Sequence, residues 1–307
     1  MRTTRREALF WAASAACQAA TAQEVAGQLT VTNPLGIRIQ PFRDGKIPAV
    51  SVFLPGNETR FAAVVEMPEH AWRKKMKADG PEGFYSMYSW DERMKAVPLW
   101  SREGNALAYR MDLPAGFTLN ARATLDSDGL EIAYRIDNPG PMAYAEVQAP
   151  TCVKLYRPFT DIFLERTYVH HPDGLDLVAS GTPERLGQNA EEWLPSRYIV
   201  RCSREAPLPP QWVEKRSDNV TRYHKIWAAD TPFIATESSP EGWVAATHSL
   251  TSPEVWTNPA RTCHHADSGA PLDANSVARL AVKLHLLRGG ASDAWARVAE
   301  RQASHQL

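Results

Sequence analysis

The chain has few of the residues that cross-link a fold through disulfides or metal ions. It contains four cysteines among 307 residues, and Cys17 lies in the apolar run near the N-terminus. The other three, Cys152, Cys202 and Cys263, allow at most one internal disulfide with one thiol left over. No short metal-ligand motif such as His-Glu-x-x-His is present. The sequence therefore predicts no disulfide framework and no metal site, it indicates no particular cofactor, and a hydrophobic core must hold the fold.

An excess of charge of one sign is also lacking. The 34 basic and 35 acidic residues leave a net charge of −1. A nearly balanced chain offers no basic field for nucleic-acid phosphates or for an anionic membrane surface. We therefore expect no nucleic-acid partner.

The apolar run at the N-terminus is too short for a permanent membrane anchor. Arg2, Arg5 and Arg6 precede it, and Ala20-Thr21-Ala22 supplies a small-x-small cleavage site. This order is typical of a secretory signal peptide, and the paired arginines resemble a twin-arginine export signal. We expect residues 1–22 to be removed, no integral membrane segment to remain, and the protein to reach a bacterial periplasm or the extracellular space.

Helix signals are scarce in the mature chain, whereas short β-prone runs with turn residues between them are frequent. In Leu130–Asp137 and in Val277–Leu287, apolar residues alternate with polar ones, as in strands with one buried face. Only Asp293–Gln302, at the end of the chain, has a helical pattern. The sequence thus predicts an all-β fold over residues 23–307, a single large antiparallel β-sandwich with a short C-terminal helix.

Two long segments lack clear alternation. Met67–Trp100 is dense in charged and aromatic residues, and Tyr156–Tyr198 is also irregular. We expect both to be long loops over one concave sheet, because such segments in a compact domain are usually functional. Tyr88 and Trp90 in the first segment would stack on a sugar ring, although aromatics in this setting equally often fill a core beneath a loop.

The densest group of chemically active residues follows a predicted hairpin of Phe233–Glu237 and Trp243–His248. It consists of Trp256, Asn258, Arg261, Cys263, His264, His265 and Asp267. Such a segment is either part of an active site or a surface loop held by buried polar residues.

Histidines dominate this group, and imidazole titrates near pH 6.5, which suits proton transfer at neutral pH. Neighbours on a strand face apart, so only one of His264 and His265 can reach a cleft. We expect that histidine to work with His248 or His170, all within about 8 Å of one another. A metal ion held by one histidine from each region, with Asp267 or His248 as a further ligand, is a weaker alternative.

The remaining polar and aromatic groups would support this chemistry. Arg261 would hold an oxyanion or carboxylate through two hydrogen bonds. Trp256 would stack on the sugar ring, with Asn258 as a further substrate contact. Asp267 would orient a histidine.

The run GLEIAYRIDNPGPMAYAEVQAPTCVKL resembles the central hairpin of galactose mutarotase-like proteins. The later segments TNPARTCHHADS and VARLAVKLHLL resemble the C-terminal half of the same large sandwich. The resemblance implies a supersandwich fold and a saccharide ligand. The separated histidines and the late glutamate base of mutarotases have no counterparts at matching positions, so it does not imply the mutarotase reaction.

These patterns together predict an exported carbohydrate-active enzyme acting on a saccharide or uronate. Epimerase- or lyase-like proton transfer fits the histidines better than hydrolysis by paired carboxylates. The alternative is a non-catalytic carbohydrate-binding or interaction module, because aromatic rings hold a sugar by stacking without any acid or base.

Overall fold

The computed structural model describes residues 29–42, 47–57, 59–75, 84–88, 98–113, 116–181, 196–202, 213–215, 221–225, 227–259 and 262–304. The predicted signal peptide lies outside these residues, as do Trp90 and Arg261. Within them, the chain forms three β-sheets and ends in one helix, α3 (Ala291–Ala303). None of the helical segments described is long and apolar enough to cross a membrane.

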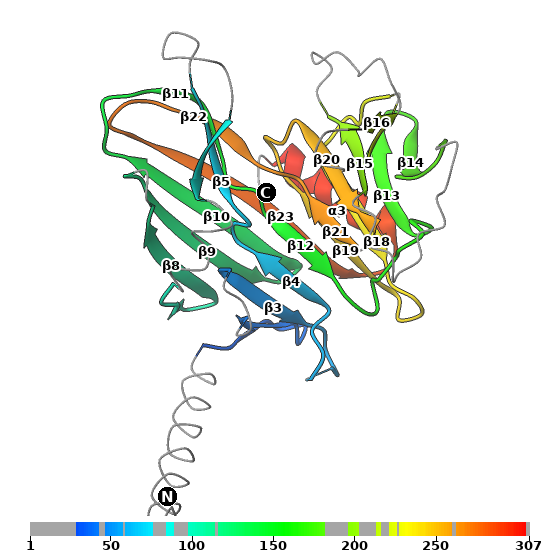
Figure 1. Cartoon of the computed structure of the whole chain (residues 1–307). Helices are drawn as coiled ribbons and strands as arrows, with labels where there is room; N and C mark the ends of the chain where they lie inside the picture. Colours follow the sequence, from blue (N-terminus) through cyan, green and yellow to red (C-terminus); the bar gives the residue numbers. More distant parts are fainter. Residues whose placement is uncertain are drawn as a thin grey trace, which may run out of the picture.

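The first sheet contains ten of the described strands. Their order is β1 (Val31–Thr32), β2 (Arg38–Pro41), β3 (Ala49–Phe53), β4 (Ala63–Glu66), β12 (Cys152–Leu155), β21 (Cys263–His265), β20 (Glu254–Asn258), β15 (Ser196–Arg201), β17 (Thr221–His224) and β16 (Val213–Lys215). Neighbours are antiparallel except β15 and β17, which are parallel. Segments far apart in the sequence therefore meet at the centre of this sheet, where β12 joins β4 to β21 (Figure 1).

The second sheet has nine described strands, all antiparallel to their neighbours. Their order is β14 (Gly174–Leu177), β13 (Thr167–His171), β18 (Phe233–Glu237), β19 (Trp243–His248), β23 (Ser276–Arg288), β10 (Gly129–Asn138), β9 (Thr118–Asp126), β8 (Ala106–Asp112) and β7 (Ser101–Glu103). A smaller four-stranded sheet has the order β22 (Gly269–Leu272), β11 (Tyr144–Gln148), β5 (Ala71–Lys75) and β6 (Phe84–Tyr88).

The core lies between the sheets and follows the alternation of the sequence. In β10, Leu130, Ile132, Tyr134 and Ile136 are buried and join the main apolar cluster. Leu280, Leu284 and Leu286 of β23 belong to the same cluster. The prediction of a large antiparallel sandwich with a short C-terminal helix is thus confirmed.

The prediction of two long loops is wrong. Met67–Trp100 contains β5 and β6, and Tyr156–Tyr198 contains β13, β14 and the start of β15. The pairing of β5 is irregular on both sides, with register shifts against β6 and β11. Such bulges place an extra residue in a strand and break the period-two pattern by which a strand is recognised.

The helix α3 packs on the face of the nine-stranded sheet that is turned away from the ten-stranded sheet. Ala291, Ala294 and Val298 contact apolar residues of β18 and β19. The Gly290 N–H at its N-terminus donates a hydrogen bond to the Asp293 carboxylate at 2.8 Å. At this end the nine-stranded sheet is therefore covered on one face by the ten-stranded sheet and on the other by α3. Side chains of β18 and β19 that point away from the ten-stranded sheet lie on the α3 side.

Candidate functional site

The two adjacent histidines of β21 point to opposite faces of the ten-stranded sheet. The ring of His264 lies between the two large sheets, where its Nε2 is 2.7 Å from the Thr236 hydroxyl and its Nδ1 is 3.3 Å from the Thr247 hydroxyl. Burial lowers the pKa of His264 to about 3. His264 is therefore a neutral core residue, and its predicted catalytic role is not supported by this position.

His265 lies on the outer face, the face of the ten-stranded sheet turned away from the nine-stranded sheet. Its Nδ1 is 3.2 Å from the Asp267 carboxylate, and the Trp256 indole stacks on the ring at 3.5 Å. Burial favours the neutral ring, but the Asp267 carboxylate and the Cys263 thiol outweigh it and raise the pKa of His265 to about 10. The ring is thus held in a fixed orientation as a positive group.

Asp267 is placed by three contacts. Besides His265, its carboxylate accepts hydrogen bonds from the Thr151 N–H and from the Trp256 indole, both at 3.3 Å. Burial would raise the pKa of Asp267, but the charge of His265 holds it below its usual value. The predicted task of orienting a histidine fits this geometry.

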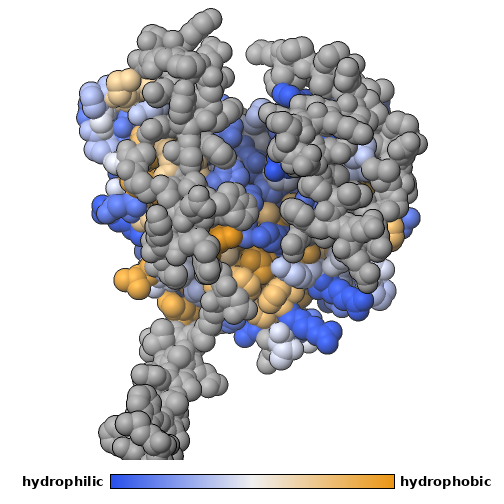
Figure 2. All heavy atoms as spheres, viewed as in Figure 1, coloured by the Kyte–Doolittle hydropathy of each residue, from blue (hydrophilic) through white to orange (hydrophobic). Residues whose placement is uncertain are grey.

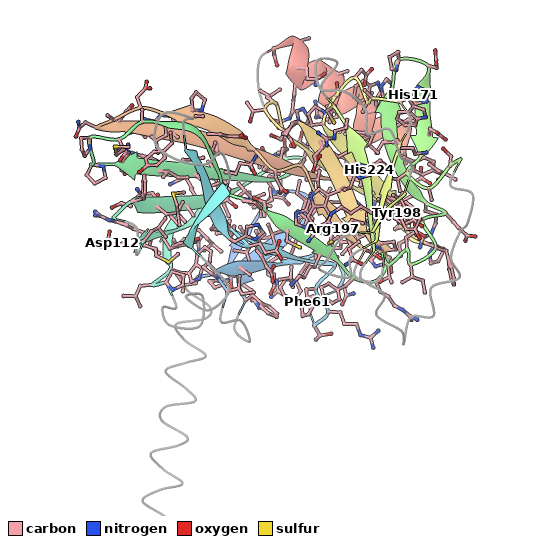
Figure 3. All side chains as sticks on the ribbon, turned by 45° about the horizontal axis from the view of Figure 1, so that its top comes forward. Phe61, Asp112, His171, Arg197, Tyr198 and His224 are labelled. Atoms are coloured by element: carbon pink, nitrogen blue, oxygen red, sulfur yellow. The ribbon has the colours of Figure 1, made fainter. Side chains whose placement is uncertain are left out.

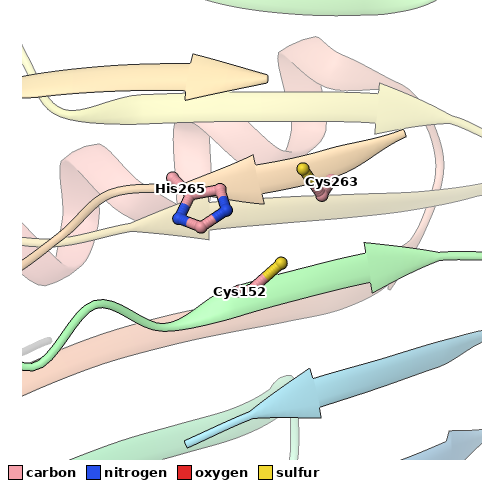
Figure 4. Close-up of side chains that lie close together, drawn as sticks. All are labelled: Cys152, Cys263 and His265. Atoms are coloured by element: carbon pink, nitrogen blue, oxygen red, sulfur yellow. The ribbon is translucent and has the colours of Figure 1, made fainter. Parts of the chain in front are cut away.

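Cysteines and carboxyl groups from earlier strands extend the site across β12 and β4. The ligand atoms of Cys152, Cys263 and His265 all lie within 4.8 Å of one another (Figure 4). The same spacing holds for Glu66, Glu69 and Cys152. Cys152 and Glu66 are direct partners in the pairing of β12 with β4, which explains their contact. We call Glu66, Glu69, Cys152, Cys263, His265 and Asp267 the outer-face cluster.

The outer-face cluster has a buried floor and a partly exposed rim. Glu66, Cys152, Cys263 and His265 form the floor, and each is at most 4% exposed. Glu69 and Asp267 are partly exposed, as is Lys154, which forms a salt bridge with Glu66. Burial raises the pKa of Glu69. Figure 2 shows hydrophilic residues in the middle of this side of the molecule. The cluster thus combines buried reactive groups with partly exposed polar groups.

Trp256 is not available for the predicted stacking on a sugar. The Arg197 guanidinium lies 4.5 Å from the centre of its ring, and His265 stacks on the ring as well. Because β20 lies between β15 and β21, these two residues approach the indole from opposite sides. Figure 3 labels Arg197 beside Tyr198 on β15. Asn258 lies on the same face as Trp256, opposite Cys263 in the pairing of β20 with β21.

His248 and His170 lie elsewhere, so the predicted convergence of three histidines is wrong. His248 is fully buried 6.4 Å from the His285 ring, and burial lowers its pKa to about 3. His170 stacks on Trp295 of α3 at 3.6 Å, with Nδ1 3.0 Å from Asp230. Both come from strands of the nine-stranded sheet, and alternation turns them away from the ten-stranded sheet toward α3.

The remaining predicted residues are not placed by the structure. Arg261 and Trp90 lie outside the described residues, and for Tyr88 only the strand, not the side chain, is described. The sequence interpretation missed Glu66, Glu69 and Cys152. Glu69 lies in the segment that was expected to be a loop, and no local pattern shows that β12 lies beside both β4 and β21.

A groove among the described residues lies on the other sheet. It measures about 810 Å³ and is lined by Arg110, Arg122, Arg135 and Arg279 on the outward face of the nine-stranded sheet. Three of these arginines form salt bridges, with Asp112, Glu103 and Asp137 respectively. No cysteine or histidine lines this groove.

Comparisons of the chain with known proteins give similarities in fold. No protein-family model matches it, and no curated protein sequence matches it. An α-N-acetylgalactosaminidase of Bifidobacterium bifidum in complex with GalNAc is 11% identical, over 90% of this chain and 39% of that chain, with a TM-score of 0.49. A galactose mutarotase-like protein of Lactobacillus casei is 11% identical, over 84% of this chain and 99% of that one, with a TM-score of 0.44.

A putative aldose 1-epimerase of Escherichia coli K12 is 10% identical, over 84% of this chain and 98% of that chain, with a TM-score of 0.46. The predicted distant resemblance to galactose mutarotase-like proteins agrees with these matches. They concern the fold alone, and they assign no activity to this chain.

Proposed function

We propose that this protein is an exported carbohydrate-active enzyme that acts on a saccharide or uronate by proton transfer at the outer-face cluster. The observation that carries the proposal is the presence of a carboxyl group, Glu69, and an oriented imidazole, His265, in one polar site near solvent. Export is supported by the N-terminal sequence, with its arginines, apolar run and cleavage site.

The cluster is costly for the fold, which favours a functional role. Burying carboxyl, thiol and imidazole groups disfavours folding unless each group finds a partner. A structural sheet face would bury apolar side chains or expose polar ones, whereas here the floor is both polar and buried. Ionisable groups concentrated in this manner are typical of active sites.

The geometry gives each group a task. Glu69 lies at the rim, where a side chain can exchange a proton with a bound sugar. His265, oriented by Asp267, presents a positive group to an oxygen that gains negative charge.

Two further cations favour an acidic sugar. Lys154 at the rim and Arg197 over Trp256 lie on the same outer face as His265. Positive groups on one face attract a carboxylate, and an arginine can bind it through two hydrogen bonds. A uronate is therefore the substrate class that the charges fit best.

The alternative of a non-catalytic module depends on open aromatic faces. Trp256, whose indole contacts His265 and Asp267 of the cluster, has its ring covered by Arg197 and His265. Among the described residues, a binding module that holds a sugar by aromatic stacking is therefore less well supported than an enzyme that acts by proton transfer.

A substrate screen with two matched variants tests the proposal. The reduced full chain is incubated with neutral and uronate oligosaccharides, and products are followed by NMR and by the ultraviolet absorbance of unsaturated uronates. We expect turnover of at least one substrate and a loss in kcat of about 100-fold or more in Glu69→Gln. Glu131→Gln, the same change on the nine-stranded sheet, should be without effect. Binding of a glycan without turnover, or full activity of Glu69→Gln, would contradict the proposal.

A further inference from the structure

We propose that the outer-face cluster binds one divalent transition-metal ion of the zinc class through Cys152, Cys263 and His265, with Glu66 as the fourth ligand. The inference goes beyond the proposed function and does not depend on it, because metal binding can be measured in a chain without turnover.

Strand geometry brings the first three donors together. Cys263 and His265 are two residues apart on β21, so both side chains point to the outer face. Cys152 lies on the neighbouring strand β12, and the three ligand atoms are within 4.8 Å of one another (Figure 4). Ligand atoms around tetrahedral zinc are about 3.3 to 3.8 Å apart, given bonds of about 2.3 Å to sulfur and about 2.0 Å to nitrogen. Small rotations of the three side chains would bring their ligand atoms from these separations to the shorter ones around a bound ion.

The carboxylate of Glu66 provides the second, independent observation. It is 4% exposed, and Oε1 is paired with Lys154. Its Oε2 is buried without a hydrogen-bond partner among the described residues. A buried carboxylate oxygen without a partner is strongly disfavoured unless a ligand satisfies it. Glu66 is the cross-strand partner of Cys152, and a carboxylate oxygen of Glu66 lies within 4.8 Å of the Cys152 sulfur, the donor that the two groups share.

The orientation of His265 leaves one nitrogen for the ion. Nδ1 is paired with the Asp267 carboxylate at 3.2 Å, so Nε2 is the nitrogen that can bind the ion. A carboxylate behind a metal-binding histidine fixes its tautomer and increases its basicity as a ligand. Trp256 stacked on the ring holds the same orientation.

The donor types select the class of metal. Two thiolates, one neutral imidazole and one carboxylate suit zinc, whereas calcium and magnesium prefer oxygen ligands only. Binding of the ion releases the thiol protons and the Nε2 proton of His265 to solvent. In this arrangement the ion supplies the positive charge that otherwise resides on the His265 ring. Glu69 is not among the four ligands and stays at the rim for proton transfer.

Cobalt titration of the reduced, metal-free full chain tests the site, because Co²⁺ bound to thiolates in tetrahedral geometry gives visible d–d bands and an ultraviolet charge-transfer band. We expect one ion per chain, displaced by Zn²⁺. Cys152→Ser and Cys263→Ser should each weaken binding by 100-fold or more, and Asp267→Asn by about 10- to 100-fold. Cys202→Ser is the matched control and should bind normally, since its thiol contacts the Val200 carbonyl away from the cluster.

Protection from alkylation keeps the test valid if a variant fails to fold. In the wild-type chain, Zn²⁺ should slow alkylation of Cys152 and Cys263 but not of Cys202. The proposal is overturned if the reduced chain gives no cobalt spectrum, if Cys202→Ser weakens binding as much as the other variants, or if zinc protects neither cluster thiol. A Cys152–Cys263 disulfide whose reduction restores no metal binding would overturn it equally.

Discussion

The Asp267 carboxylate holds Nδ1 of His265 at 3.2 Å, while the Trp256 indole covers the ring at 3.5 Å and also donates a hydrogen bond to Asp267. The three residues thus form a closed set in which each fixes the other two. The other ring nitrogen, Nε2, is left for the thiols of Cys152 and Cys263, whose ligand atoms lie within 4.8 Å of that of His265.

Removing the charge of Asp267 should loosen the orientation of His265 and lower the free energy of unfolding. In Asp267→Asn, the buried His265 ring loses its counter-ion, and breaking a buried ion pair costs about 3 to 5 kcal/mol. Urea unfolding measures this loss. Asp273→Asn, the same change at an exposed position, should alter stability by less than about 0.5 kcal/mol. Equal effects of the two variants would contradict the role of Asp267.

His264 should matter for stability and not for chemistry. In His264→Leu, the Thr247 hydroxyl loses its contact with the ring, while Thr236 keeps a 2.9 Å hydrogen bond to Thr167. We expect a loss of about 1 to 3 kcal/mol in the free energy of unfolding, from the unsatisfied hydroxyl. The kcat should be unchanged at temperatures where the variant is folded. A large fall in kcat at full folding would place His264 in the reaction.

Stability should fall with acid because His248 and His264 are buried as neutral rings. Burial lowers the pKa of each to about 3, whereas an unfolded histidine titrates near 6.5. The unfolded chain therefore takes up protons first, so the stabilisation is complete above pH 6.5 and is lost as pH falls toward 3. Each histidine contributes a slope of up to about 1.4 kcal/mol per pH unit within this range.

The pH dependence of urea unfolding between pH 7 and 4 measures this slope. Besides burial, Arg301 and a protonated His285 disfavour the protonated form of His248, and neither offers it a counter-ion. His248→Asn and His264→Asn should each flatten the curve. A wild-type stability that is constant from pH 7 to pH 5 would contradict the burial of neutral histidines.

The ion pairs beneath α3 should hold the helix on the nine-stranded sheet. Lys283 is fully buried, with its ammonium 3.0 Å from Asp128 and 2.5 Å from Asp126. Arg301 of α3 reaches Asp128 at 2.8 Å. Asp128→Asn leaves Lys283 with one carboxylate less and should cost about 3 kcal/mol or more.

Asp137 provides the comparison, because its pair with Arg135 at 2.8 Å is open to solvent. Asp137→Asn should cost at most about 1 kcal/mol. Hydrogen exchange should show α3 opening more readily in Asp128→Asn only. Similar exchange in both variants would mean that apolar packing alone holds the helix.

The sequence predicted the strands whose alternation is complete and local. In β10 the inward positions from Leu130 to Ile136 are apolar, so this buried face could be predicted without knowing its neighbours. The irregular pairing of β5 hid that strand, because a bulge interrupts the alternation.

The site was predictable only where its residues are close in the sequence. His265 and Asp267 are two residues apart, and strand alternation was enough to relate them. Cys152 and Glu66 join them through the order of strands in a sheet, which no local pattern encodes. For the same reason His248 was expected beside His265, although its strand belongs to the other sheet.

The most direct test of the central claim compares the two outward sheet faces in one assay. Turnover of the best substrate is measured for Glu69→Gln on the ten-stranded sheet and for Arg279→Gln in the groove of the nine-stranded sheet. The outer-face cluster as active site predicts a loss of about 100-fold or more in kcat for Glu69→Gln and wild-type turnover for Arg279→Gln. Loss of turnover in Arg279→Gln, with Glu69→Gln fully active, would contradict it.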